Sequence, residues 1–394
     1  MKILHIIPTL SKGGAERLVI DITRNILESK KSEVKLVIFR DEIEYQVEDM
    51  REFIQIIPSS VTLSFKSKPI LRINELKTFI EQFMPDVIHT HLFEAEIVSR
   101  FCNYSKARWF THVHDNMPQL KNLSFKLLAN KQAVTNYFEK KILFKNYFKN
   151  GGTHFIAISS HTEAYIKSVQ SKYPVTLLHN AINVKRFQNT KEFKHPITNS
   201  DDSQTTPNFQ PLTHNASLLN PQPSTLNLIN IGSFVSKKNQ NFLLDIIFEL
   251  KACNFNVNCI FLGDGPTKKE VEMRAMDLNI INQCNFLGNV EQVEEYLWKS
   301  DVYVHTAIYE PLGLVLIEAM AAGLPIVTLD GHGNRDLMEN GKNGFILKEQ
   351  DPKMFATKII EVHINQEIKE FNIHFARQYD IGNYTSKLLG IYNL

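Results

Sequence analysis

Strand-like and helix-like segments alternate along most of this chain, and that alternation limits the possible folds more than any single motif. In a first run the strand-like segments are residues 2–7, 34–39, 85–89 and 154–158. In a second run they are residues 226–231, 257–262, 302–305 and 326–329. Amphipathic stretches separate them, as in parallel sheets with crossover helices. We therefore predict an α/β fold made of two Rossmann-like, doubly wound domains.

A break in composition separates the two runs. Residues 190–225 are rich in Asn, Gln, Ser, Thr and Pro and contain few apolar side chains. Such a segment cannot bury enough apolar surface to order itself. With 394 residues the chain is also long for a single core. We predict an N-terminal domain at 1–185, a flexible polar linker at 186–225 and a second domain at 226–370.

Composition also excludes several classes of protein. No run of about twenty apolar residues could span a membrane, and Met1 leads directly into a strand rather than a signal peptide, so we expect a cytoplasmic protein. A net charge of +2 does not indicate a nucleic-acid binder. The cysteines have no metal-type spacing, and we expect reduced core residues at Cys102, Cys253, Cys259 and Cys284.

The stretch E-P-L-G-L-V-L-I-E-A-M-A-A-G, which begins at Glu310, carries two carboxylates. Pro311 disfavours helix at the residue before it, so we expect Glu310 in a loop. Gly313 and Leu314 then open a helix whose first backbone N–H groups suit a phosphate. Glu318 is one turn further along, a single charge among apolar side chains. It requires a partner, either a Lys or Arg of the protein or a ligand that carries hydroxyl groups.

Glycine turns follow several of the predicted strands. Gly14 belongs to a Gly-Gly turn before a helix, and Lys238 stands at another helix entrance after a strand. Gly263 and Gly265 end a third strand, and Gly288 belongs to a further turn that precedes a helix. Each turn alone is weak evidence for a ligand site, but together the turns border the crevice in which such sheets bind ligands. The pattern G-x-G-x-x-G is absent, which disfavours a dinucleotide oxidoreductase.

Histidines alternate at strand ends in the first run, at His89 and His91 and again at His112 and His114. Residues two apart on a strand share a face, so the two pairs could assemble a metal site. Alternatively, an imidazole at the crevice could bond a substrate hydroxyl without a metal. No carboxylate or cysteine completes a ligand spacing, so we predict no metal.

Residues 121–150 form a basic and aromatic stretch in which lysines outnumber the single acidic residue, Glu139. Its helices would have an apolar face and a positive rim, suited to an anionic bilayer surface. An ordinary core-facing helix with solvated lysines explains the pattern equally well. Both interpretations remain open.

Taken together, these motifs carry a family resemblance. The segments G-G-A-E, D-V-I-H-T-H, H-N-A-I-N, G-S-F-V-S-K-K-N, L-G-D-G-P, F-L-G and E-P-L-G-L-V-L-I-E-A-M-A-A-G-L-P resemble the family 4 retaining glycosyltransferases of the GT-B fold. The resemblance covers nearly the whole chain except the polar insertion. It implies two domains that face each other across a cleft, with the acceptor in 1–185 and the nucleotide-sugar in 226–370. It also implies that a C-terminal helix at 371–394 crosses back onto the first domain.

The resemblance assigns roles to individual residues. Glu318 corresponds to the glutamate that binds the ribose hydroxyls, and Glu310 to the one near the donor sugar. Lys238 corresponds to the lysine that offsets charge on the diphosphate, and Gly14 to the glycine turn near the same phosphates. His114 resembles the histidine beside the sugar. Lys238, Glu310 and His114 are therefore the predicted catalytic residues.

The remaining predicted donor-binding positions are Gly14, Ser233, Gly263, Gly265, Phe286, Gly288, Leu312, Gly313, Leu314 and Glu318. Within this set, the resemblance implies that the Leu312–Leu314 backbone holds the sugar and diphosphate and that the turn from Phe286 to Gly288 meets the base. Ser233 stands where the family commonly has arginine. Lys237 or Arg335 could supply the missing charge.

The resemblance implies a retaining transferase that moves a hexose from a UDP- or GDP-sugar to a glycan or lipid-linked acceptor in bacterial cell-surface polysaccharide biosynthesis. No cofactor or metal is expected, because no D-x-D motif occurs near the crevice. Peripheral association with the inner face of the membrane follows only if residues 121–150 bind lipid. The alternatives are a nucleotide-sugar epimerase of the same fold and, given Ser233, a non-catalytic sugar-nucleotide binding protein.

Overall fold

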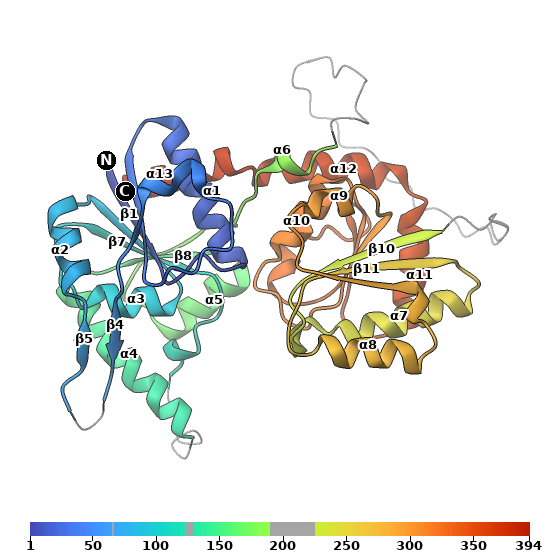
Figure 1. The fold of residues 1–394 in the computed structure, drawn as a ribbon, viewed down its shortest axis with the longest axis horizontal. Coiled ribbons are helices and arrows are strands. Elements are labelled where there is room, and N and C mark those ends of the chain that lie inside the picture. The colour runs from blue at the N-terminus through green and yellow to red at the C-terminus, as the bar shows by residue number, and fades with distance from the viewer. Residues whose placement is uncertain (65–66, 123–129, 190–224) are drawn as a thin grey trace.

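The computed structural model describes residues 1–64, 67–122, 130–189 and 225–394. They form two α/β lobes that lie side by side, each built on a parallel sheet (Figure 1). The predicted fold class is confirmed. The predicted polar linker at 186–225 lies almost wholly outside the described residues, and the predicted domain boundaries stay a prediction.

The first lobe is built on a seven-stranded sheet in the order β3-β2-β1-β6-β7-β8-β9. Its strands are β1 (Lys2–Ile7), β2 (Glu33–Ile38), β3 (Ile54–Ile56), β6 (Val87–His91), β7 (Arg108–Val113), β8 (His154–Ala157) and β9 (Val175–Leu177). A small antiparallel hairpin consists of β4 (Ser60–Thr62) and β5 (Ile70–Arg72). The helices are α1 (Gly14–Ser29), α2 (Asn74–Phe83), α3 (Phe93–Arg100), α4 (Lys131–Lys149) and α5 (Ser160–Val169). The short helix α6 (Val184–Phe187) follows β9 and packs against the second lobe.

The second lobe is built on a six-stranded sheet in the order β12-β11-β10-β13-β14-β15. Its strands are β10 (Leu226–Ile231), β11 (Val257–Leu262), β12 (Cys284–Gly288), β13 (Val302–His305), β14 (Ile326–Leu329) and β15 (Gly344–Leu347). The helices that follow β10 are α7 (Gln240–Ala252), α8 (Lys268–Asp277), α9 (Val293–Leu297), α10 (Leu314–Ala321), α11 (Pro352–His363), α12 (Gln366–Ala376) and α13 (Ile381–Tyr392).

Both sheets are doubly wound, and this topology fixes where a ligand can bind. The central strands read as nearly continuous apolar runs because helices cover both of their faces. In the first sheet the strand order reverses between β1 and β6, and in the second between β10 and β13. The loops after the carboxyl ends of these strands border a crevice at each reversal. The segments singled out in the sequence follow β1, β7, β10, β11 and β13.

The last two helices join the lobes. Helix α12 packs against α10 of the second lobe, whereas α13 packs against α1 of the first. The hydroxyl of Tyr392, at the end of α13, lies 2.5 Å from Nδ1 of His89. Both chain termini therefore lie together in the first lobe (Figure 1).

The cysteines are all free, and three of them are buried as expected. Cys253 is exposed, so its prediction as a core residue is wrong. It caps the C-terminus of α7, where the chain turns away at the surface of the lobe.

Candidate active site

The N-terminus of α10 is the centre of the candidate site. Gly313 is its N-cap, with a φ of 98° that favours glycine, and a Cβ added there would lie 2.8 Å from Leu316 Cδ1. The backbone N–H groups of Gly313, Leu314 and Val315 have no hydrogen-bond partner among the described residues. Leu312 is buried beneath the turn. The predicted helix start is therefore present, with donors free for an anion.

Glu310 precedes this helix in a loop, as Pro311 predicts, and its carboxylate is held by the protein. Its Oε2 accepts from Lys238 Nζ at 2.5 Å and lies 3.0 Å from His305 Nε2. Burial alone would raise the pKa of Glu310, but Lys238 and His305 outweigh it and hold the pKa at about 2. Glu310 is therefore ionised at neutral pH, and Lys238 is its ion-pair partner.

Glu318 is in the opposite situation. It is half-buried in the second turn of α10 and makes no hydrogen bond or ion pair with any residue that the structure describes. Burial raises the pKa of Glu318, and Arg17 and Arg186 oppose that rise only from a distance. The sequence left two kinds of partner open for Glu318, a Lys or Arg of the protein or a ligand with hydroxyl groups. No described lysine or arginine pairs with it.

The first lobe contributes the start of α1. A Cβ added to Gly14 would lie 3.4 Å from Leu314 Cδ1, so the first turns of α1 and α10 are neighbours across the lobes. The N–H of Gly13 donates to the Tyr45 hydroxyl at 3.0 Å, which fixes the turn before α1. Two helix N-termini consequently face the same space.

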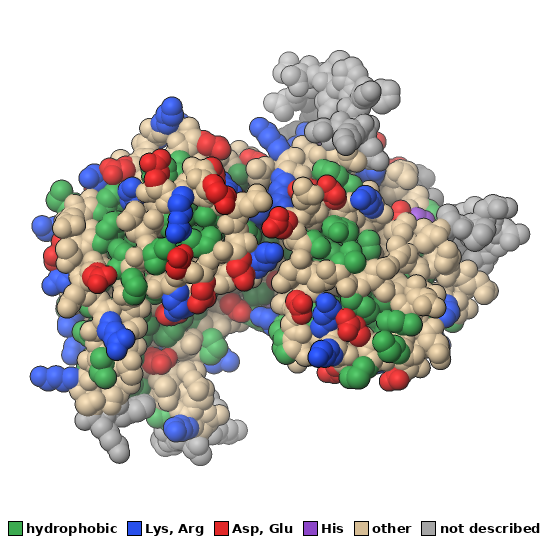
Figure 2. Space-filling view, viewed as in Figure 1, with side chains coloured by type: hydrophobic (Ala, Val, Ile, Leu, Met, Phe, Trp, Pro, Cys, Tyr) green, Lys and Arg blue, Asp and Glu red, His purple; other side chains and the backbone are tan. Residues whose placement is uncertain are grey.

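His114 follows β7 at the same border between the lobes. The next residue, Asp115, accepts a hydrogen bond from the Tyr309 hydroxyl at 2.5 Å and lies 3.6 Å from Lys237 Nζ. These contacts tie the loop after β7 to the loops that carry Lys238 and Glu310. Figure 2 shows acidic and basic side chains together along the groove between the lobes.

The predicted glycine turns of the second lobe pack against one another. A Cβ added to Gly263 would lie 2.1 Å from the carbonyl oxygen of Gly232, and one added to Gly265 2.4 Å from that of Phe234. The N–H of Gly263 donates to the Gly288 carbonyl at 2.7 Å. Only glycine permits these backbones to approach so closely.

Two predicted positions of this region differ in their surroundings. Phe286 is half-buried, and its ring stacks on Phe261 with centroids 4.7 Å apart, so its side chain belongs to the edge of the core. Ser233 is exposed. The charges suggested as replacements for arginine at Ser233 are both paired with carboxylates: Lys237 with Asp115, and Arg335 with Asp330 at 2.7 Å.

The sequence interpretation missed several side chains of this site. His305 ends β13, and a histidine at a strand end was the only signal that could have indicated it. Asp115 and Tyr309 are neighbours of predicted residues, but no local pattern indicates that they bond each other. Arg17, in the first turn of α1, was missed as well.

Two family models match the chain. Residues 12–186 match Glycosyltransferase Family 4, and residues 219–378 match Glycosyl transferases group 1. Together these matches span both lobes and nearly all of the candidate site.

Individual relatives agree with these models. The putative glycosyltransferase EpsF of Bacillus subtilis is 24% identical over 345 residues, which is 84% of this chain and 79% of EpsF. The lipopolysaccharide core biosynthesis glycosyltransferase LpsE of Rhizobium meliloti is 28% identical over 142 residues, which is 36% of this chain and 41% of LpsE.

Solved structures share the whole architecture. HepE of Anabaena, solved in complex with UDP and glucose, superposes with a TM-score of 0.73 at 18% identity and covers 100% of this chain and 99% of its own. WaaG, a glycosyltransferase involved in lipopolysaccharide biosynthesis, has a TM-score of 0.67 at 14% identity, with 99% of each chain covered. At these identities the likeness shows the fold, which is GT-B.

Proposed function

Because this chain belongs to the family 4 glycosyltransferases, we propose that it transfers a hexose from a UDP- or GDP-sugar to a glycan or lipid-linked acceptor, with retention of the anomeric configuration. Three similar proteins support this proposal. EpsF and LpsE are named as glycosyltransferases, and HepE was solved in complex with UDP and glucose. We further propose that the acceptor belongs to a cell-surface polysaccharide.

The observation that carries the proposal is the environment of Glu318. A half-buried carboxylate that no described residue bonds is costly unless a ligand bonds it. The ribose of a nucleotide offers two adjacent hydroxyl donors that a carboxylate can accept together. The unbonded N–H groups at the start of α10 lie one turn away, where the diphosphate of the same ligand would be.

Charge develops on the diphosphate as the sugar leaves, and fixed donors at that position lower the barrier. We assign this role to Lys238 and to the N-terminus of α10. A bound diphosphate would share Lys238 with Glu310, which in turn would face the sugar. Since these groups supply the positive charge, we propose that transfer needs no metal and continues in excess EDTA.

For retention we propose a front-face substitution. The bond between the anomeric carbon and the diphosphate oxygen breaks, and a bond to the acceptor hydroxyl oxygen forms on the same face. The hydroxyl proton passes to the departing phosphate oxygen. This route requires no enzyme nucleophile, and Glu310 is already engaged by Lys238 and His305. The anomeric coupling constant of the product, measured by NMR, tests retention.

Membrane association stays a proposal that depends on α4. Leu143 and Tyr147 of this helix are buried in the core, but Phe148 is 75% exposed among lysines. Residues 123–129 of the predicted basic stretch lie outside the described residues. No helix in the described ranges is long and apolar enough to cross a bilayer. Sedimentation with anionic vesicles, with Phe148→Ser as the variant, tests the proposal, and absence of binding by the unmodified protein counts against it.

A thermal-shift panel of UDP-, GDP- and ADP-sugars tests the donor site. We expect one nucleotide series to raise the melting temperature, and Glu318→Ala and Lys238→Ala to reduce that rise. Glu370→Ala and Lys269→Ala, at exposed positions of α12 and α8, are the matched controls. Donor binding that survives both site substitutions contradicts the assignment. Release of an isomerised free sugar without an acceptor would instead indicate the epimerase alternative.

A further inference from the structure

Five histidine side chains pack against one another inside the first lobe, four on β1, β6 and β7 and one directly after β7. They are His5, His89, His91, His112 and His114, and neighbouring ring centroids lie 4.2 to 5.3 Å apart. Strand register places His5 beside His89 and His91 beside His112. All except His114 are fully buried. The family resemblance gives a role only to His114, beside the donor sugar, so the other four need an explanation.

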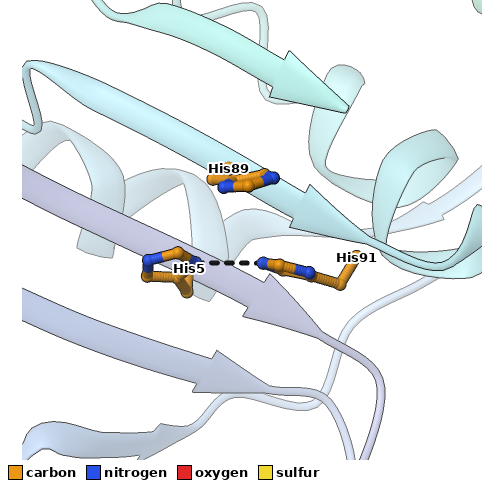
Figure 3. Close-up of side chains that lie close together, drawn as sticks. All are labelled: His5, His89 and His91. Carbon is orange, nitrogen blue, oxygen red and sulfur yellow. Dashed lines mark hydrogen bonds between the residues drawn. The ribbon is translucent and has the colours of Figure 1, made fainter. Parts of the chain in front are cut away.

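Three of these rings are hydrogen-bonded in series. Nδ1 of His5 lies 3.0 Å from Nε2 of His91, and Figure 3 shows the two rings edge to edge. Nδ1 of His91 in turn lies 3.0 Å from Nε2 of His114. His89 lies off this line and bonds Tyr392 instead. The series therefore leads from the interior of the lobe to the border of the cleft.

Each ring of the series is neutral at pH 7. Burial lowers the pKa of His5 to about 3 and holds the pKa values of His91 and His114 well below the usual range. A neutral imidazole carries one N–H, so one nitrogen donates and the other accepts. Two hydrogen bonds in series consequently force all three rings into the same tautomer, either Nδ1–H throughout or Nε2–H throughout. The tautomer of His114 depends on His5.

Ring geometry disfavours a metal ion in this cluster, although two sets of three histidines each have nitrogens within 4.8 Å of one another: His5, His89 and His91, and His91, His112 and His114. The lone pair of an imidazole lies in the ring plane, so the ligands of one ion point their ring edges at a common centre. His89 and His91 instead stack at 4.3 Å with planes 28° apart, and His112 and His114 stack at 4.2 Å and 7°. Stacked rings direct their lone pairs along nearly parallel planes.

The buried end of the series selects the tautomer. Nε2 of His5 is buried and has no partner among the described residues. A buried N–H without a partner is rarer than an acceptor without one, so this nitrogen carries no proton. His112 follows the same rule: its Nε2 lies 3.2 Å from Asn180 Oδ1, and its buried Nδ1 is the unpartnered, unprotonated nitrogen. The proton of His5 is therefore on Nδ1, and each ring donates toward the cleft.

We propose that His5 and His91 are positioning residues that hold His114 as the Nδ1–H tautomer, so that His114 donates a hydrogen bond to an oxygen of the donor sugar. The identity of that ligand rests on the proposed function, whereas the tautomer does not. Nδ1 of His114 has no partner in the part of the chain that the structure describes, and the side chain is only half-buried. In this tautomer Nδ1 of His114 donates a hydrogen bond to a sugar oxygen and cannot accept a proton as a base.

The tautomer can be measured directly in the full-length protein by ¹⁵N NMR of labelled histidine side chains. His114 is assigned from the signals that disappear in His114→Gln. We expect a protonated Nδ1 and an unprotonated Nε2 at His114 in the unmodified protein without any ligand. A protonated Nε2 there overturns the proposal. This measurement stands apart from the donor-binding panel, so a failed donor assignment and a failed tautomer assignment are distinguishable.

Two variants then test the dependence on the buried ring. His5→Phe removes the first hydrogen bond, and we expect mixed tautomers at His114 and about fivefold weaker binding of the nucleotide-sugar identified by the panel, with unchanged binding of the nucleoside diphosphate alone. His89→Phe is the matched control, since it replaces an equally buried ring outside the series. An unchanged His114 spectrum in His5→Phe, or the same change in His89→Phe, overturns the proposal. Stoichiometric zinc or nickel in the purified protein would also overturn the proposal.

Discussion

Replacing Lys238 with methionine removes the cation that keeps Glu310 ionised inside the protein. Glu310 is 7% exposed, and Lys238 Nζ lies 2.5 Å from its carboxylate. Burial would raise the pKa of Glu310, yet its partners lower it from the ordinary 4.5 to about 2. At about 1.36 kcal/mol per pKa unit this difference amounts to about 3 kcal/mol of folding free energy. Loss of one partner of a buried ion pair costs roughly 3–5 kcal/mol, in agreement with that figure.

The pH dependence has a definite sign. Because the pKa of Glu310 is lower in the folded state, the unfolded chain binds more protons between about pH 4.5 and about pH 2. The contribution to stability is complete above pH 4.5 and disappears as the pH falls through that window. The difference between the unmodified protein and Lys238→Met should therefore be large at pH 7 and much smaller near pH 2.5.

Urea unfolding followed by circular dichroism measures this effect. We expect Lys238→Met to lose about 3 kcal/mol at pH 7, and Lys238→Met/Glu310→Gln to regain most of it because no unpaired charge remains. Lys269→Met, at an exposed lysine, is the control and should change stability by less than about 0.5 kcal/mol. A loss at pH 7 no larger than in this control, or an equal loss at both pH values, would refute the reasoning.

Three further changes have defined outcomes. Burial raises the pKa of Glu318, so its ionised form opposes folding. Glu318→Gln should therefore melt at an equal or higher temperature in calorimetry. In a binding titration the same variant should bind the nucleotide about tenfold more weakly. Gly263→Ala sets a Cβ 2.1 Å from a backbone oxygen at a φ of +131°, so urea unfolding should show a loss of more than about 2 kcal/mol. Arg100→Met leaves the fully buried Glu96 unpaired and should cost about 3–5 kcal/mol in the same assay.

The fold could be predicted largely from the alternation of segments. Long apolar runs such as β1 and β10 stand out because they are buried on both faces. The pattern did not indicate β7, a central six-residue strand in which Thr111 and His112 interrupt the apolar run. It also did not indicate short strands at the edges of the two sheets, such as β9 and β15. Three or four residues at a sheet edge carry too little apolar periodicity to distinguish a strand from a loop.

The site could be predicted as a set of positions but not as a set of bonds. The helix start at Gly313 follows from local rules, because a glycine after Pro311 and before an apolar run opens a helix. The Lys238–Glu310 pair joins residues 72 positions apart, and the Tyr309–Asp115 bond joins residues 194 apart. Such pairings depend on which strand ends the sheet topology brings together, and no local spacing contains that information.

The two carboxylates that flank Gly313 explain how the site can be stable without ligand and still bind one. Glu310 has two protein partners and a lowered pKa, whereas Glu318 has neither partner nor ion pair among the described residues and a raised pKa. The first stabilises the folded chain, and the second opposes folding until a ligand bonds it. On the proposed function, the donor satisfies Glu318 with its ribose hydroxyls and shares Lys238 with Glu310. Binding should therefore raise the pKa of Glu310, because the diphosphate is an anion that shares Lys238 with it, and lower the pKa of Glu318, because the ribose hydroxyls donate to its carboxylate.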